Sequence, residues 1–130
     1  VDKNYRTRKG RESTAIMGSS MGGLITHYGI YAYPDVFSKA GIFSPSYWYS
    51  ESVYAYTEEH PVPKDTRLYL LVGKKEGPVM SDHLDKMYEF IIDRGHPKEN
   101  ISAKTNPEGE HNEKFWRSEL KEAIRWLFEK

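Results

Sequence analysis

The chain has 130 residues, with 19 basic and 19 acidic side chains and no cysteine. This length suits one core, so we expect residues 1–130 to form a single domain. The balanced charge argues against nucleic acid or an anionic membrane surface as a partner. The absence of cysteine leaves no disulfide, no thiolate metal site and no cysteine nucleophile, and it slightly favours a cytoplasmic location.

Two further features bear on partners and location. The basic cluster at residues 6–11 is the best candidate for nucleic-acid contact. It is short, has no interleaved aromatic residues and precedes a strand, so we predict a solvated loop there. No apolar run approaches the length that spans a membrane, and no signal segment is visible. We therefore expect neither nucleic acid nor a membrane as a partner.

Predicted strands and helices alternate along the chain. In chain order we expect a strand over 12–18, a helix over 21–33, a strand over 39–43, a helix over 51–58, a strand over 67–72, a helix over 81–94, a strand over 100–104 and a helix over 113–128. Such alternation implies parallel pairing. The expected fold class is α/β, with a mostly parallel sheet of about four strands and flanking helices. Ligands of such folds bind outside the carboxyl ends of the strands.

Three of these elements carry patterns that predict their burial. The run at 67–72 is almost continuously apolar, which is typical of a strand covered on both faces. Residues 100–104 alternate apolar and polar side chains, which indicates a half-exposed edge strand. The closing helix has an apolar stripe that we expect to face the core. Its members are Trp116, Leu120, Ile124 and Leu127.

The motif G-x-S-x-G occupies residues 18–22, with Ser20 at its centre. An apolar strand precedes it and a helical segment follows it, which is the setting that a nucleophile elbow requires. The turn holds the serine in a strained backbone conformation, and Gly18 and Gly22 leave room for neighbouring chain. The N-terminus of the helix favours negative charge at the reacting centre. We therefore predict that Ser20 is a nucleophile.

A serine nucleophile needs a base, and histidine is the usual one because its pKa lies near neutrality. Helical rise puts His27 roughly 10 Å along the axis from Ser20, so we expect it to be a packed or surface residue rather than the base. Three other histidines lie beside prolines or within a predicted helix. His111 follows the last strand in a glycine-containing loop, at the rim where ligands bind. We predict that His111 is the base.

The third member should be a carboxylate that orients the imidazole. The chain order Ser…Asp/Glu…His requires it between Ser20 and His111. Glu76 follows the most apolar strand, and we favour it over Asp82 and Asp85, which both lie inside the next predicted helix. Asp82 is also explained as a first-turn residue stabilised by the helix dipole. The alternative interpretation of Glu76 is a solvated loop carboxylate, since two lysines precede it.

The backbone amide of Met21, which follows the nucleophile, is the expected oxyanion donor. A second donor normally comes from a loop after an earlier strand, and the sequence predicts no strand before residue 12. The expected chemistry needs neither a metal nor a cofactor.

These motifs together resemble the esterase D group of α/β hydrolases, which includes feruloyl esterases, siderophore esterases and mycolyltransferase-type enzymes. The resemblance implies Ser20 as nucleophile, His111 as base and Glu76 as the acid. It also implies that Tyr47 and Trp48 line the substrate pocket, although Trp48 could equally be ordinary core packing. The matching segments span most of the chain: RE at 11–12, AIMGSSMGG at 15–23, YPDVF at 33–37, FSPSYW at 43–48, VG…E at 72–76 and GEH…W at 109–116.

Members of this group carry further strands before the nucleophile, including the one that supplies the second oxyanion donor. The chain therefore resembles the C-terminal half of such a hydrolase, a partial domain without the N-terminal strands. In the family's sheet the nucleophile strand is interior, so the edge at Ser13–Met17 would be open here. We expect this edge to pair with a second copy, a swapped element or a separate N-terminal half.

The resulting interpretation is a serine hydrolase that cleaves small-molecule carboxylic esters through an acyl-enzyme intermediate. An acyltransferase with the same three residues is one alternative, because it differs only in the acceptor of the acyl group. A truncated, non-catalytic fragment that acts as an assembly or binding module is the other.

Overall fold

Four parallel strands form the sheet of the computed structural model, which describes residues 10–129. The strands are β1 (Ala15–Ser19), β2 (Lys39–Phe43), β3 (Arg67–Gly73) and β4 (Ile101–Asn106), in the spatial order β1-β2-β3-β4. Because all the pairs are parallel, the carboxyl ends of the strands lie at one rim of the sheet. The predicted α/β class and the parallel sheet of about four strands are confirmed.

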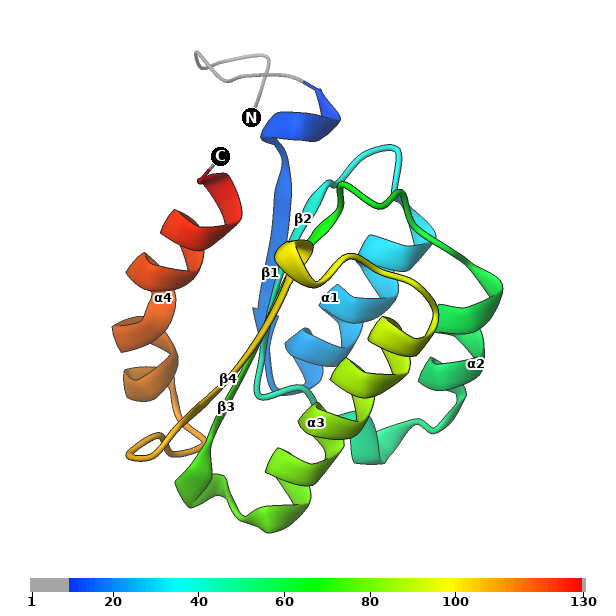
Figure 1. Cartoon of the computed structure of the whole chain (residues 1–130). Helices are drawn as coiled ribbons and strands as arrows, with labels where there is room; N and C mark the ends of the chain where they lie inside the picture. The colour runs from blue at the N-terminus through cyan, green and yellow to red at the C-terminus, as the bar shows by residue number, and fades with distance from the viewer. Residues whose placement is uncertain (1–9, 130) are drawn as a thin grey trace.

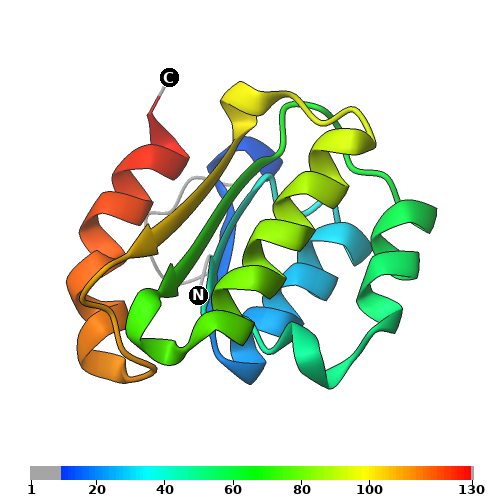
Figure 2. The same ribbon diagram turned by 60° about the horizontal axis from the view of Figure 1, so that its bottom comes forward.

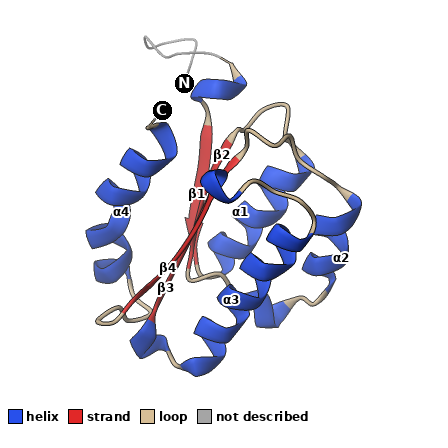
Figure 3. Cartoon of the chain, in the orientation of Figure 1, coloured by secondary structure: helices blue, strands red, loops and turns tan. Residues whose placement is uncertain are grey.

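Helices cover both faces of this sheet, as Figure 1 and the turned view in Figure 2 show. One face carries α1 (Met21–Ala32) and α3 (Pro78–Asp93), with α2 (Ser52–Glu59) packed outside them, and the other face carries α4 (Glu113–Phe128). Figure 3 separates these helices from the strands by colour and shows the short helical turns between them. These turns are 3-10 helices at Arg11–Ser13, Tyr47–Tyr49, Lys74–Glu76 and Lys98–Asn100. Within residues 10–129, no helix is long and apolar enough to cross a membrane.

Both faces of β3 are buried, as its apolar run predicts. Leu68 and Leu70 belong to the cluster that includes side chains of α1 and α3. Tyr69 and Leu71 belong to a second cluster, which includes side chains of α4. The alternating side chains of one strand thus hold a helix layer on each side of the sheet, because each layer removes apolar area from water. The strand β4 lies at the other edge of the sheet, as its sequence pattern predicts.

Several element boundaries differ from the sequence prediction. Residue Glu12 lies in the Arg11–Ser13 turn, and the first strand begins only at Ala15. The third helix begins at Pro78 rather than at residue 81. Proline is favoured in the first turn of a helix because it needs no N–H partner there, and Gly77 precedes it with a φ of 109° that favours glycine.

The predicted buried stripe of α4 is wrong at two of its four positions. Leu120 and Ile124 are 40% and 42% exposed. The residues that face the sheet are Phe115, Glu119, Ala123 and Leu127. Glu119 can be buried because the Lys104 ammonium lies 2.9 Å from its carboxylate and the Asn106 amide donates to it. Hydrophobic periodicity assigns a carboxylate to the solvent side, and only its partners on β4 reverse that assignment.

The strand β1 forms an edge of the sheet, pairing with β2 alone among the residues described. All five of its residues are half-buried, whereas β2 and β3 are buried almost throughout. Ile16 packs partly against the cluster of the α1 face and Met17 against the cluster of the α4 face. Among the described residues, β1 therefore has the open edge that the sequence predicts.

The basic cluster at residues 6–11 falls mostly outside the described residues. Of its members Arg11 is described, and it contacts Asp65 at 2.9 Å and donates to the Thr66 hydroxyl at 2.8 Å. This arginine is therefore tied to the turn before β3 rather than free in a solvated loop.

Candidate active site

Three side chains from separate strand-to-helix connections meet at the carboxyl rim of the sheet. Ser20 follows β1, Glu76 follows β3 and His111 follows β4. The Ser20 Oγ lies 2.9 Å from His111 Nε2, and His111 Nδ1 lies 2.6 Å from Glu76 Oε1. The structure thus brings together the three residues that the sequence singled out as nucleophile, base and acid.

The turn at Ser20 is a sharp strand-to-helix junction. Ser20 has φ 59° and ψ −121°, a conformation that a non-glycine residue adopts only at a cost. A Cβ at Gly18 would collide with the carbonyl of Gly22, and one at Gly23 would come within 2.8 Å of the Phe43 carbonyl oxygen. The prediction of close approach is therefore confirmed at Gly18. It is wrong for Gly22, where an added Cβ would meet nothing within 4 Å and where Gly23 takes the crowded position instead.

The Ser20 turn is also held by the last residue of β2 and by the segment that follows it. The Ser20 amide donates to the Phe43 carbonyl at 3.0 Å, and the Ser46 amide donates to the Ser20 carbonyl at 3.2 Å. These bonds satisfy backbone groups on both sides of the exposed hydroxyl, and they fix its direction toward the rim.

Glu76 is buried, with its side chain only 1% exposed. Its Oε2 accepts hydrogen bonds from the Gly73 amide at 2.7 Å and from the Ser44 hydroxyl at 2.6 Å, while Oε1 faces His111. The alternative of a solvated loop carboxylate is therefore wrong. The neighbouring Lys75 turns away and pairs with Glu108 at 3.0 Å.

Asp82, the rival carboxylate, lies exposed on α3. The structure therefore places Glu76, and not Asp82, against the imidazole.

His111 reaches the rim because two glycines let its loop cross the end of β3. A Cβ at Gly73 would collide with the backbone of Gly109, and a Cβ at Gly109 would come within 2.6 Å of the Phe115 ring. The Lys75 amide donates to the Gly109 carbonyl at 3.0 Å, which anchors the crossing. The side chain of His111 is 41% exposed, so a ligand can approach it from solvent.

Two residues that the sequence analysis did not place in the site also contact this group. Ser44 bonds Glu76, as described above, and the Trp116 indole N–H donates to the Ser44 hydroxyl at 2.8 Å. The Trp116 ring also meets the His111 ring edge-on, with centroids 5.1 Å apart. Both residues stood in the segments that carry the family resemblance, but no local pattern connects them to Glu76.

The two aromatic residues predicted to line a substrate pocket lie in different environments. Tyr47 is only 2% exposed, and its hydroxyl lies 2.9 Å from Nδ1 of the buried His27. A ligand at the rim therefore cannot reach its ring without a rearrangement, and the prediction for Tyr47 conflicts with its burial. Trp48 is 59% exposed and stands at an accessible surface, so core packing does not explain it.

His27 is a packed residue, as its distance from Ser20 predicts. Its Nε2 lies 2.7 Å from the Thr57 hydroxyl, which itself donates to the Val53 carbonyl. The hydroxyl proton of Thr57 is thus used, so His27 Nε2 carries a proton and Nδ1 accepts from the Tyr47 hydroxyl. Burial lowers the pKa of His27 to about 3, which keeps its ring neutral.

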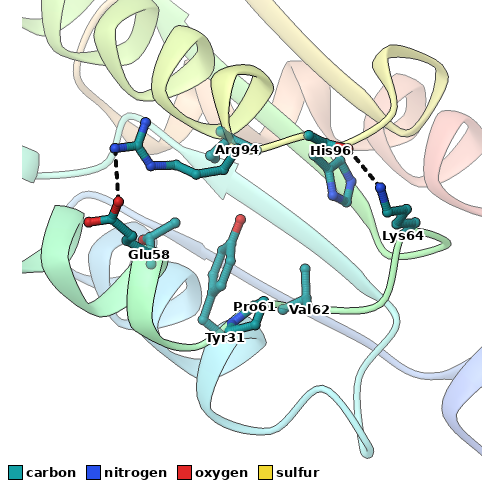
Figure 4. A pocket seen from close by; sticks show the side chains of 10 residues that line it. Tyr31, Glu58, Pro61, Val62, Lys64, Arg94 and His96 are labelled. Atoms are coloured by element: carbon teal, nitrogen blue, oxygen red, sulfur yellow. Dashed lines mark hydrogen bonds and ion pairs between the residues drawn. The ribbon is translucent and has the colours of Figure 1, made fainter.

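A pocket of about 200 Å³ lies at the opposite end of the sheet, among the carboxyl ends of α1, α2 and α3 (Figure 4). Glu58 and Arg94, which pair at 3.2 Å, line it together with Tyr31 and His96. Its lining contains none of the three rim residues. Across residues 10–129, no group of three or more His, Cys, Asp or Glu side chains is placed to hold a metal ion.

The parallel sheet with helices on both faces is shared with hydrolases and esterases of the α/β-hydrolase fold. Residues 1–127 match the family model Esterase, described as "Putative esterase". The chain therefore belongs to this esterase family.

Individual relatives match nearly the whole chain. The Bacillus subtilis (strain 168) protein described as "Uncharacterized protein YbbA" is 24% identical over 137 residues, covering 100% of this chain and 55% of the relative. The S-formylglutathione hydrolase FrmB of Staphylococcus aureus has a TM-score of 0.76 at 21% identity, over 98% of this chain and 55% of that one. The enterobactin esterase FES of Shigella flexneri has a TM-score of 0.79 at 23% identity, over 93% of this chain and 33% of that one. The chain thus spans about half the length of the first relatives that it matches, or less.

Proposed function

We propose that this chain carries the reacting residues of a serine hydrolase that cleaves small-molecule carboxylic esters through an acyl-enzyme intermediate. The observation that carries the proposal is the continuous hydrogen-bonded chain from Ser20 Oγ through the His111 ring to Glu76. Membership of the esterase family supports the reaction class. The strained backbone of Ser20 supports its role as the nucleophile, because strain of this kind is retained where function requires it.

The proposed mechanism follows from the donors and acceptors of the three side chains. A carboxylate only accepts, so Glu76 holds the proton of His111 on Nδ1 and leaves Nε2 free to accept from Ser20. The Ser20 oxygen bonds to the ester carbonyl carbon as its proton moves to Nε2. The imidazolium then returns that proton to the departing alcohol. Water repeats the sequence in the second half-reaction: it loses a proton to Nε2, attacks the acyl carbon, and releases the carboxylic acid as Ser20 regains its proton.

The amide of Met21 is the proposed oxyanion donor. Met21 is the first residue of α1, and amides in the first turn of a helix have no partner within the helix. The positive end of the helix dipole adds to the stabilisation of an oxyanion there. A second donor, if it is supplied by another segment, would contribute a rate factor of ~10²–10³, so we expect the isolated 130 residues to react slowly.

A fluorophosphonate probe tests the proposal, because it bonds covalently to an activated serine without needing the natural ester. We expect the purified chain to be labelled at Ser20, and Ser20→Ala to remove the label. Ser19→Ala is the matched control, since it removes a hydroxyl one residue away in the same motif and should leave labelling intact. Labelling that survives in Ser20→Ala, or a folded chain that does not react at all, would refute the proposal.

We also propose that the open edge of β1 is paired in the working assembly. Its first three residues, Ala15, Ile16 and Met17, are apolar and only half-buried, and an unpaired edge of this kind accepts a further strand. Large apolar side chains of the flanking helices are exposed as well, among them Ile25 on α1 at 64% and Ile124 on α4 at 42%. In a solution of the isolated chain the available partner is a second copy, so we propose self-association through this edge; a separate N-terminal half would compete for it.

A further inference from the structure

Ser44 occupies a costly backbone conformation next to the candidate active site. It follows β2 with a φ of 45°, in the left-handed region that side chains other than glycine seldom occupy. It is fully buried, at 0% exposure, and its amide donates to the Leu71 carbonyl at 2.7 Å. A strained and buried serine is retained when its side chain has a partner that a glycine could not supply.

The direction of the hydrogen bonds around Ser44 is determined by the chemistry of its partners. The Trp116 indole N–H can only donate, so the Ser44 oxygen must accept from it, at 2.8 Å. A carboxylate can only accept, so the Ser44 hydroxyl proton must point at Glu76 Oε2, at 2.6 Å. Because the Ser44 oxygen accepts from the indole, its O–H bond is directed at the Glu76 carboxylate.

This arrangement leaves the Glu76 carboxylate little freedom to rotate. Oε2 is held by two donors, the Ser44 hydroxyl and the Gly73 amide, so Oε1 must face the imidazole. The Trp116 ring meets the His111 ring edge-on, so one residue anchors the carboxylate through Ser44 and also limits the movement of the base. We infer that Ser44 and Trp116 are positioning residues, which hold Glu76 and His111 in register with Ser20. This inference rests on the proposed function, because the positioning affects a reaction only if Ser20 is the nucleophile.

Two substitutions at Ser44 separate its hydroxyl from its backbone. Ser44→Ala removes the hydroxyl and keeps the strained φ, whereas Ser44→Gly removes the hydroxyl and relieves the strain. We expect both variants to lower the rate of fluorophosphonate labelling by ~10- to 100-fold, because a small displacement of the base costs a comparable factor. Their thermal stabilities should differ while their rates agree. A rate that follows stability instead would mean that Ser44 serves the fold alone.

Trp116→Phe removes the indole donor and retains an aromatic ring. We expect a smaller loss than in the Ser44 variants, because the freed hydroxyl can still reach Glu76. Trp126→Phe is the matched control. Trp126 lies on the same helix, where Arg67 lies over its ring and the Tyr69 ring meets it at a tilt, and its substitution should leave the labelling rate unchanged. An equal loss in both tryptophan variants would contradict the inference.

A readout without turnover keeps this inference separate from the proposed function. The 15N shifts of the His111 ring report which nitrogen carries the proton. We expect the Nδ1–H form in the unaltered chain, with the Nε2–H form appearing in Ser44→Ala and Ser44→Gly as the carboxylate loosens. Unchanged ring shifts in both variants would overturn the inference even if Ser20 is labelled. If the ring shifts change but Ser20 is never labelled, the positioning role stands and the hydrolase proposal fails.

Discussion

The buried imidazole of His27 should make the stability of this protein fall in mild acid. The ring has 0% exposure and bridges α1 to Tyr47 and to Thr57 of α2. Protonation would put a donor on Nδ1 opposite the Tyr47 hydroxyl and would place a charge in the core. Burial therefore lowers the pKa of His27 from 6.5 to about 3 in the folded state.

The size of the effect follows from the difference between the two pKa values. In the unfolded chain the ring titrates near 6.5, so between that pH and about 3 the unfolded state binds the extra proton. Stability is complete above pH 6.5 and is lost progressively as the pH falls below it. At about pH 5 the pH lies ~1.5 units below the pKa of the unfolded ring, so protonation stabilises the unfolded state there. Relative to about pH 7.5, this lowers the free energy of unfolding by about 2 kcal/mol. Burial also lowers the pKa of His96, which adds a contribution of the same sign.

Urea denaturation at the two pH values measures this loss. We expect His27→Asn to be less stable at both, because it loses ring packing, but to show a pH dependence that is smaller by about 2 kcal/mol. His60→Asn removes one exposed histidine and should keep the full dependence. If His27→Asn does not fold, the ring protons of His27 in the unaltered chain can be followed by NMR. A ring that becomes protonated in the folded chain between pH 7 and pH 5 would refute the reasoning.

Three further predictions follow from the same contacts. Glu76→Gln should lower fluorophosphonate labelling by ~10²-fold or more while Asp82→Asn leaves it unchanged, and equal rates would contradict the choice of acid. Lys104→Met should lower the free energy of unfolding by about 3 kcal/mol, because it removes the charged partner of the buried Glu119, and an unaltered urea midpoint would disagree with this pairing. Sedimentation velocity should detect association of the isolated chain, with slow amide exchange along Ser13–Met17; a monodisperse monomer with fast exchange there would count against a paired edge.

Local patterns were enough for much of the fold. Strand β2 and helix α4 have the predicted bounds, because alternating burial and helical spacing act within a few residues of sequence. The elbow at Ser20 was also visible locally, since its glycines, preceding strand and following helix are contiguous. The parallel pairing of the strands followed from their alternation with helices, because a parallel crossover needs an intervening element.

Other features depend on partners that are distant in the sequence. The burial of Glu119 requires Lys104 and Asn106 on another element, so hydrophobic periodicity placed the wrong stripe of α4 against the sheet. Tyr47 is buried in the main core cluster with its hydroxyl against His27, and a pattern of aromatic residues cannot reveal these partners.

The sequence by itself determined the α/β class and proposed Ser20, Glu76 and His111 as candidates, because strand ends and motif spacing restrict where such residues can lie. Only the tertiary structure decided that Glu76 rather than Asp82 contacts His111. Only the tertiary structure shows that Ser44 donates to this carboxylate and that Trp116 donates to Ser44. The two residues of each contact are separated by 35, 32 and 72 positions in the sequence, respectively. Such pairs become neighbours only when the strands align at one rim, and no local propensity encodes that distance.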